Sequence, residues 1–198
     1  MNDSYTTNLA EFLIQSNSLK FGNFKLASGK NSSFYIDLRL IQSFPGIFHQ
    51  TIIALRDIIQ SKNLRFHMLA TIPTSGLIFT SALAYEMFRP LIYIRREKKC
   101  YGINNLVEGK LEKTQKILLI DDVVTTGQSL NIAIENIRNN GGIVENVLCI
   151  LLRGDNTTIK NFNAIGINLH FLLTINELAN ILHKNQWIND EKKLALQK

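Results

Sequence analysis

The residues with the clearest chemical potential lie in the segment Ile117–Leu130, whose sequence is ILLIDDVVTTGQSL. Its four leading apolar residues are typical of a buried strand, and two carboxylates, Asp121 and Asp122, follow them directly. Small and hydroxyl-bearing residues come next and lead into a predicted helix: Val123, Val124, Thr125, Thr126, Gly127, Gln128 and Ser129. The N-terminus of a helix presents free N–H groups and a partial positive charge, which favour a bound phosphate. The segment therefore predicts an anion-binding loop at the end of a strand.

The acidic pair beside this loop needs its own explanation, because carboxylates repel a phosphate. A ligand that also carries vicinal hydroxyls accounts for the pair, as does a magnesium ion coordinated by those hydroxyls. Carboxylates beside a ribose ring also stabilise positive charge that develops at the anomeric carbon. Phosphate, hydroxyls and a cationic transition state together indicate a phosphoribosyl donor. An ordinary strand–turn–helix with a polar N-cap is the alternative.

A run of cations and one separate arginine complete the set of candidate functional residues. The run RREKK, from Arg95 to Lys99, places four cations within five residues. Cations repel one another unless they face an anion, and the diphosphate of 5-phosphoribosyl-1-diphosphate (PRPP) is such an anion. A solvated basic loop between two strands is the alternative. Arg153 follows the apolar run 147–152, at the expected end of another strand, where a ligand contact is favoured.

The composition places these residues in a globular chain. Its 198 residues are 45% hydrophobic, enough for one domain with a real core. No apolar run approaches the ~20 residues of a membrane span. The first residues lack the basic start and long apolar stretch of a signal peptide, so we expect a cytoplasmic protein without membrane contact. The net charge of +6 permits nucleic-acid binding, but the basic residues are dispersed, and we expect none. Cys100 and Cys149 lie in dissimilar surroundings and are expected to be free thiols; no Cys/His spacing suggests a metal site.

The elements that must position these residues alternate along the chain. Strands are predicted at 66–72, 91–94, 116–120, 144–152 and 168–172, with helices at 44–59, 77–87 and 129–139. A helix at 6–16, strands at 24–26 and 34–38, and helices at 175–183 and 190–196 break the alternation. Alternation of this kind implies an α/β fold, with a central parallel sheet and helices on both faces. We expect a single domain over 1–198, with a core at about 44–167 and a small hood from about 1–43 and 168–198.

The order of residue types in Ile117–Leu130 resembles the PRPP signature of type I phosphoribosyltransferases, which implies that family's Rossmann-like fold. Three further features resemble orotate phosphoribosyltransferases in particular. They are the segment 24–39, FKLASGKNSSFYIDLR, the segment 93–110, YIRREKKCYGINNLVEGK, and Arg153. The resemblance implies transfer of the phosphoribosyl group from PRPP to orotate, giving orotidine 5'-monophosphate in UMP biosynthesis.

The resemblance also implies residue roles. The PRPP contacts would come from Arg95, Arg96, Lys99, Tyr101 and the whole run 121–129. The catalytic residues would be Lys99, in a mobile loop that closes over the diphosphate, together with Asp121 and Asp122. Orotate would be bound by Thr125 and by Arg153, which would pair with the carboxylate. Weaker candidates are Tyr35, Ile36, Thr74, Ser75 and Gly76.

Three positions depart from the family pattern. Ala27 and Ser75 stand where many members carry lysines that contact PRPP, so those lysine roles are not carried over. Tyr101 stands where histidine is common, so a proton-donating imidazole is not expected there. The family implies magnesium held mainly through substrate oxygens, and a homodimer in which the loop 95–109 acts across the interface. A phosphoribosyltransferase for another base and a PRPP-binding regulator of nucleotide metabolism are the alternatives; the chain looks too short for an enzyme that makes PRPP.

Overall fold

The structure is a computed structural model that describes residues 3–25, 29, 31–95 and 106–197. These residues form two compact units. One consists of Met1–Thr51 with Leu173–Lys198, and the other of Ile52–Leu172. The expected single domain, with boundaries near 44 and 168, stays a prediction.

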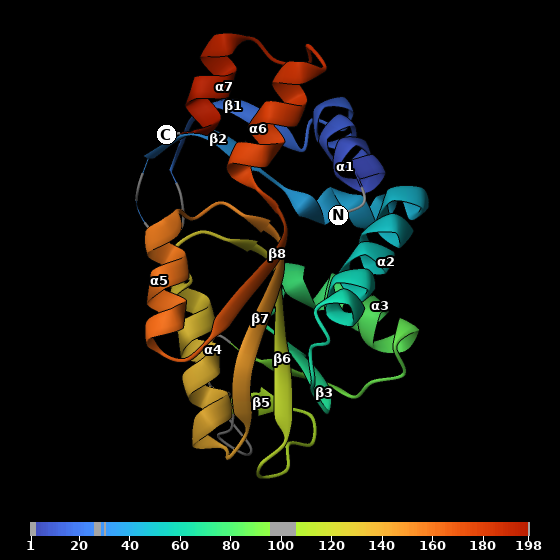
Figure 1. The fold of residues 1–198 in the computed structure, drawn as a ribbon, viewed down its shortest axis with the longest axis vertical. Helices are drawn as coiled ribbons and strands as arrows, with labels where there is room; N and C mark the ends of the chain where they lie inside the picture. The colour runs from blue at the N-terminus through green and yellow to red at the C-terminus, as the bar shows by residue number, and fades with distance from the viewer. Residues whose placement is uncertain (1–2, 26–28, 30, 96–105, 198) are drawn as a thin grey trace. The chain divides into compact units, whose positions relative to one another are not determined.

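The larger unit is built on a six-stranded sheet in the order β5-β4-β3-β6-β7-β8 (Figure 1). Its strands are β3 Met68–Thr71, β4 Leu91–Ile94, β5 Val107–Glu108, β6 Lys116–Val124, β7 Ile143–Leu152 and β8 Asn168–Thr174. Strand β3 is parallel to β4 and β6, and β6 is parallel to β7, whereas the short β5 is antiparallel to β4. The near-continuous apolar sequences of β6 and β7 suit strands that are covered on both faces. A mostly parallel sheet flanked by helices confirms the predicted fold class.

Helices cover both faces of this sheet (Figure 1). They are α2 Pro45–Ser61, α3 Ser75–Glu86, α4 Gln128–Asn139 and α5 Asn156–Ala164. Helices α4 and α5 lie on one face, and α3 lies on the other. The apolar stripe of α4, with Ile134 and Ile137, joins Phe162 of α5 and Val147 of β7 in one buried cluster. Burial of this amphipathic face is what holds α4 and α5 on the sheet.

The smaller unit contains a two-stranded antiparallel sheet and several helices. Its elements are α1 Asp3–Gln15, β1 Leu19–Lys25, β2 Asn31–Ile36, the 3-10 helix η1 Leu38–Ser43, α6 Ile175–Lys184 and α7 Asp190–Leu196. Leu9 and Leu13 of α1 and Leu178 and Leu182 of α6 are buried, as their helical spacing predicts. A capping box between Thr174 and Glu177 starts α6.

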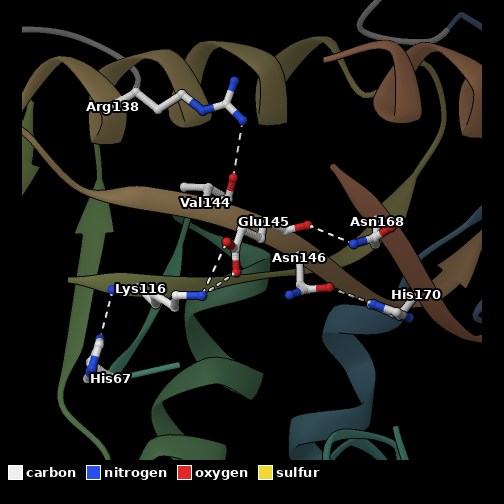
Figure 2. Close-up of polar contacts among 8 residues, drawn as sticks. All are labelled: His67, Lys116, Arg138, Val144, Glu145, Asn146, Asn168 and His170. Carbon is white, nitrogen blue, oxygen red and sulfur yellow. Dashed lines mark hydrogen bonds and ion pairs between the residues drawn. The ribbon is translucent and has the colours of Figure 1, made fainter. Parts of the chain in front are cut away.

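Polar side chains bond to one another where the central strands begin (Figure 2). The Nζ of Lys116, at the start of β6, lies 3.0 Å from a carboxylate oxygen of Glu145 on β7. The backbone N–H of Lys116 donates to Nδ1 of His67 at 2.8 Å. On α4, the guanidinium of Arg138 donates to the carbonyl of Val144 at 3.1 Å. The amino ends of these strands are therefore joined by contacts within the protein.

Several elements differ from their predictions. Strand β1 begins at Leu19 instead of Phe24, and the short strand β5 was not predicted. Strand β6 was expected to end at Ile120 but continues through Val124, because its pairing with β7 continues as far as Val124 and Leu152. The predicted strand 34–38 ends at Ile36, and a 3-10 helix capped by the Asp37 side chain follows. Helix α5 was not predicted at all. Among the described residues, none of the helices has the length and apolar character needed to cross a bilayer.

Candidate active site

The acidic pair lies in the last part of β6, where both side chains are partly buried. The backbone N–H of Asp122 donates to Oδ1 of Asp121 at 3.0 Å. The hydroxyl of Ser75 donates to Oδ2 of Asp122. Because Ser75 begins the helix that follows β3, the carboxyl ends of the neighbouring strands β3 and β6 meet at this point. Ligands of open α/β sheets bind at such strand ends.

The turn between β3 and α3 approaches the acidic pair closely. A Cβ on Gly76 would lie 3.1 Å from Oδ1 of Asp121 and would collide with the hydroxyl of Thr71. Only glycine therefore permits α3 to start so near to β6. Thr74 is exposed beside this turn, and the Pro73–Thr74 peptide bond is cis. Three of the weaker candidates, Thr74, Ser75 and Gly76, thus lie next to the two aspartates.

The loop from Thr125 to Ser129 connects β6 with α4. Gly127 has φ +74°, a left-handed conformation that favours glycine, and it begins α4 without a side-chain cap. The ring of Phe162 lies where a Cβ on Gly127 would have to be, at 2.5 Å. Thr126, Gln128 and Ser129 are exposed. The loop therefore presents hydroxyls and the positive end of α4 to solvent, as an anion site requires.

Arg153 directly follows β7, beside the loop. The N–H groups of Arg153 and Gly154 both donate to the carbonyl of Val124, at 2.8 and 3.1 Å. The guanidinium is half-buried, and burial lowers the pKa of Arg153 from its usual value because the charged form loses hydration. A partly desolvated guanidinium suits a carboxylate ligand, because the pair forms a charge-assisted, bidentate contact.

Cys149, on β7, is paired with Asp121 of β6 in the sheet. Its thiol is buried, and burial together with the nearby Asp121 charge raises its pKa well above the usual value. The thiol therefore stays protonated and unreactive at neutral pH.

Of the remaining candidate residues, some lie in the smaller unit and some fall outside the described residues. Arg95 follows β4, and its guanidinium lies 3.3 Å from Oε1 of Glu108. Tyr35 and Ile36 lie on β2 of the smaller unit, so they are not among the residues that the larger unit brings together. The candidates Arg96, Lys99 and Tyr101 fall outside the described residues, as do Ala27 and Cys100.

Sequence reasoning missed the segment after Arg153 that contacts the loop. Thr158 on α5 is buried, and its hydroxyl donates to the carbonyl of Thr125 at 3.0 Å. Asp155 caps α5 by accepting from the backbone N–H of Thr158. An aspartate followed by asparagine and threonines, DNTT, is a helix-start signal that would have located this element.

Comparisons with known proteins agree with this geometry. The family described as "Phosphoribosyl transferase domain" matches residues 41–168. The orotate phosphoribosyltransferase of Sulfolobus acidocaldarius is 36% identical over 92% of this chain and 91% of its own length. That of Cenarchaeum symbiosum is 39% identical over 90% of each chain. The crystal structure of the Aeropyrum pernix orotate phosphoribosyltransferase has a TM-score of 0.78 and 31% identity, over 91% of this chain and 99% of that one.

A parallel sheet with an acidic pair and a small-residue loop at its strand ends defines a phosphoribosyltransferase of type I. Within that class, the relatives named above are orotate phosphoribosyltransferases. The chain belongs to the orotate phosphoribosyltransferase family. The resemblance seen in the sequence motifs is thereby confirmed.

Proposed function

We propose that this chain transfers the 5-phosphoribosyl group from PRPP to orotate, giving orotidine 5'-monophosphate and diphosphate in UMP biosynthesis. One observation carries the proposal. In a chain of this family, an acidic pair, a loop of small and hydroxyl-bearing residues and a half-buried arginine lie together at the carboxyl ends of β6 and β7.

The loop is proposed to hold the 5-phosphate of PRPP. The hydroxyls of Thr125, Thr126 and Ser129, the side chain of Gln128 and the first N–H groups of α4 are the donors for its oxygens. Gly127 lets the backbone approach the phosphate. Val123 and Val124 belong to the end of β6 and set the position of the loop rather than supplying polar contacts.

The acidic pair is proposed to contact the ribose hydroxyls. As the bond from C1 to the diphosphate oxygen loosens, positive charge develops on the ribose ring, and Asp121 and Asp122 stabilise it. The hydrogen bond from Ser75 holds the Asp122 carboxylate in one orientation before the reaction. N1 of orotate then forms the new bond to C1 and gives up its proton to water or to a diphosphate oxygen, while diphosphate leaves with the electron pair of the broken C1–O bond. Arg95, Arg96, Tyr101 and Lys99 are proposed to contact the diphosphate, with Lys99 stabilising its developing charge.

Arg153 is proposed to orient orotate through its carboxylate, together with Thr125. The two residues lie close together, because the N–H of Arg153 donates to the carbonyl of Val124, the residue before Thr125. A neutral base offers no carboxylate to a half-buried cation, so this residue favours orotate over uracil or a purine.

Magnesium is proposed to be required, because it would neutralise the diphosphate and make it a better leaving group. The donor set fits, since Asp121 and Asp122 offer the oxygen ligands that magnesium prefers. The described residues hold no cluster of three or more His, Cys, Asp or Glu side chains for a metal. Substrate oxygens are proposed to complete the coordination.

We further propose a cytoplasmic homodimer in which the loop 95–109 acts on the partner's site, with no nucleic-acid partner. Tyr85 and Phe88, at the end of α3, stack with ring centroids 6.4 Å apart and are 83% and 91% exposed. Exposed aromatic pairs of this kind often mark a protein interface.

Mixing two inactive variants tests the loop's action across the interface. If Lys99 acts in the partner's site, each hybrid dimer of Lys99→Ala with Asp122→Asn contains one intact site. About half of the dimers in an equal mixture are hybrids, so the mixture recovers about a quarter of wild-type activity. If the loop serves its own site, the mixture stays inactive. Sedimentation of the wild-type protein as a monomer would also remove the homodimer proposal.

The main experiment is an assay with PRPP, magnesium and a panel of bases. Formation of orotidine 5'-monophosphate from orotate, with diphosphate released in equal amount, is the expected result. Turnover of uracil or a purine with none of orotate would favour another phosphoribosyltransferase. PRPP binding without any turnover would favour a regulator of nucleotide metabolism.

A further inference from the structure

Helix α5 supports the anion-binding loop from within the larger unit. The Oγ1 of Thr158 donates to the carbonyl of Thr125 at 3.0 Å, and this threonine is only 7% exposed. The ring of Phe162, 1% exposed, packs directly against Gly127. Helix α5 thus contacts the loop at two residues, one through a hydrogen bond and one through packing.

The start of α5 is itself held in place. Asp155 accepts a hydrogen bond from the backbone N–H of Thr158, and this contact lowers the pKa of the Asp155 carboxyl. Between β7 and α5, a Cβ on Gly154 would collide with the carbonyl of Thr125 and the hydroxyl of Thr158. The helix therefore approaches the loop so closely that only glycine fits at the crossing.

These hydrogen bonds determine which way the peptide groups of the loop face. A trans peptide is planar, with its C=O and N–H on opposite sides. When Thr158 holds the carbonyl of Thr125 toward α5, the N–H of Thr126 must point away from α5. In the same way, the N–H groups of Arg153 and Gly154 hold the carbonyl of Val124, which directs the N–H of Thr125.

We propose that Thr158 is a positioning residue for phosphate binding, which acts by directing the N–H of Thr126 toward the 5-phosphate of PRPP. The inference rests on the proposed function, because the 5-phosphate is assigned to this loop there. It adds a residue 29 positions beyond the loop's end at Ser129, on a helix to which the proposed function assigns no substrate contact.

The test compares Thr158→Val, which keeps the shape of the side chain but removes the hydroxyl, with Thr158→Ser, which keeps the hydroxyl. Two probes separate the ends of the substrate: ribose 5-phosphate for the loop, and inorganic diphosphate for the opposite end. Binding of each probe is measured by calorimetry, and kcat and KM are measured with PRPP and orotate.

We expect Thr158→Val to weaken ribose 5-phosphate binding and to raise the KM for PRPP by about 3- to 10-fold, the effect of one lost hydrogen bond. Binding of diphosphate and kcat should change little, and Thr158→Ser should restore both affected constants. Thr158→Ala serves in place of the valine variant if that protein does not fold.

The control is Thr51→Val, in the smaller unit. Thr51 is also fully buried, and its hydroxyl donates to a backbone carbonyl, that of Ile47, at 2.7 Å. This variant should lose stability without any change in ribose 5-phosphate binding. An equal loss of binding in the control would mean that lower stability alone explains the effect, and would overturn the proposal.

Unchanged ribose 5-phosphate binding in Thr158→Val, or a serine variant as weak as the valine variant, would also overturn it. A loss of diphosphate binding as large as that of ribose 5-phosphate would do the same. Failure of the proposed function looks different. In that case the wild-type protein makes no orotidine 5'-monophosphate, while the binding measurements still decide the role of Thr158.

Discussion

Polar side chains make different kinds of contact at the two ends of the central strands. Where β6 and β7 begin, Lys116 pairs with Glu145, and His67 accepts from the backbone of β6 (Figure 2). Where β6 ends, Asp122 accepts from the neutral hydroxyl of Ser75, and the loop beyond it opens α4 without a side-chain cap. At one end Lys116 and Glu145 neutralise each other, whereas at the other a carboxylate is held by a neutral donor and a helix N-terminus faces solvent, which suits the proposed substrate contacts.

The comparison explains why similar residue types have different consequences at the two ends. An exposed ion pair such as Lys116–Glu145 contributes between nothing and about 1 kcal/mol to stability, because water screens it. The same kind of carboxylate beside a developing positive charge contributes several times as much to a reaction, because it is already oriented. The variants below pair a substitution at the carboxyl ends of the strands with a matched control away from them.

The largest effect is expected for Asp122→Asn. Loss of one carboxylate that stabilises the ribose cation should lower kcat by about 100- to 1,000-fold, with only a small change in thermal stability. The matched control is Glu145→Gln, at the opposite end, which should keep full turnover and lose less than about 1 kcal/mol of stability. Steady-state kinetics and urea unfolding give both values. Full turnover by Asp122→Asn would remove the catalytic role of this residue.

Arg153→Lys should have the next largest effect. A lysine keeps the charge but cannot form the bidentate contact with a carboxylate, so we expect the KM for orotate to rise by about 10- to 100-fold. The KM for PRPP should stay near its wild-type value. Arg138→Lys, at the other end, loses a guanidinium that bonds to the carbonyls of Val144 and Ile165. Arg138→Lys should lose stability but keep both KM values. If Arg153→Lys raised only the KM for PRPP, the proposed contact between Arg153 and the orotate carboxylate would be contradicted.

Ser75→Ala removes the neutral hydroxyl that donates a hydrogen bond to Asp122. Without its hydroxyl, the Asp122 carboxylate loses a hydrogen bond and can turn away from the substrate, so kcat should fall by about 3- to 10-fold. Ser61→Ala is the control, because Ser61 also donates near a helix end, to the carbonyl of Ile58. Equal kinetics for the two variants would show that Ser75 does not orient Asp122.

Most of the central site could be predicted because its residues are close in sequence. A strand, an acidic pair, a small-residue loop and a helix follow one another between Ile117 and Leu130, and each leaves a local signal. The apolar runs of β6 and β7 likewise indicated a buried parallel sheet. The contact between Ser75 and Asp122 spans 47 positions, so no local pattern indicates it.

The failures have physical causes as well. Aspartate is rare in strands, which suggested that β6 ended at Ile120, but pairing with β7 outweighs that preference as far as Val124. Helix α5 is mostly polar and buries little more than Thr158 and Phe162, so its hydrophobic periodicity is weak. The buried face of α5 depends on residues distant in sequence, because Phe162 packs into the core cluster and against Gly127 of the loop.

The smallest effect is a pH dependence at the amino ends of the strands. His170 on β8 bonds through Nε2 to Oδ1 of Asn146 at 3.0 Å (Figure 2). Burial, with a smaller contribution from the charge of Lys62, lowers the pKa of His170 in the folded protein. The unfolded chain therefore binds a proton at a higher pH than the folded chain does. Stability should be complete above the unfolded pKa, about 6.5, and should decrease as the pH falls toward the folded value.

Urea unfolding at several pH values between 5 and 8 measures this dependence, and His170→Gln should reduce its slope while keeping a donor for Asn146. The kinetic constants for orotate at pH 7.5 should not change in this variant, because His170 lies on the end of the sheet whose polar groups bond within the protein. An unchanged slope would mean that another group titrates. A change in turnover would contradict the division of roles between the two ends of the sheet, since that division assigns substrate contacts to the carboxyl ends alone.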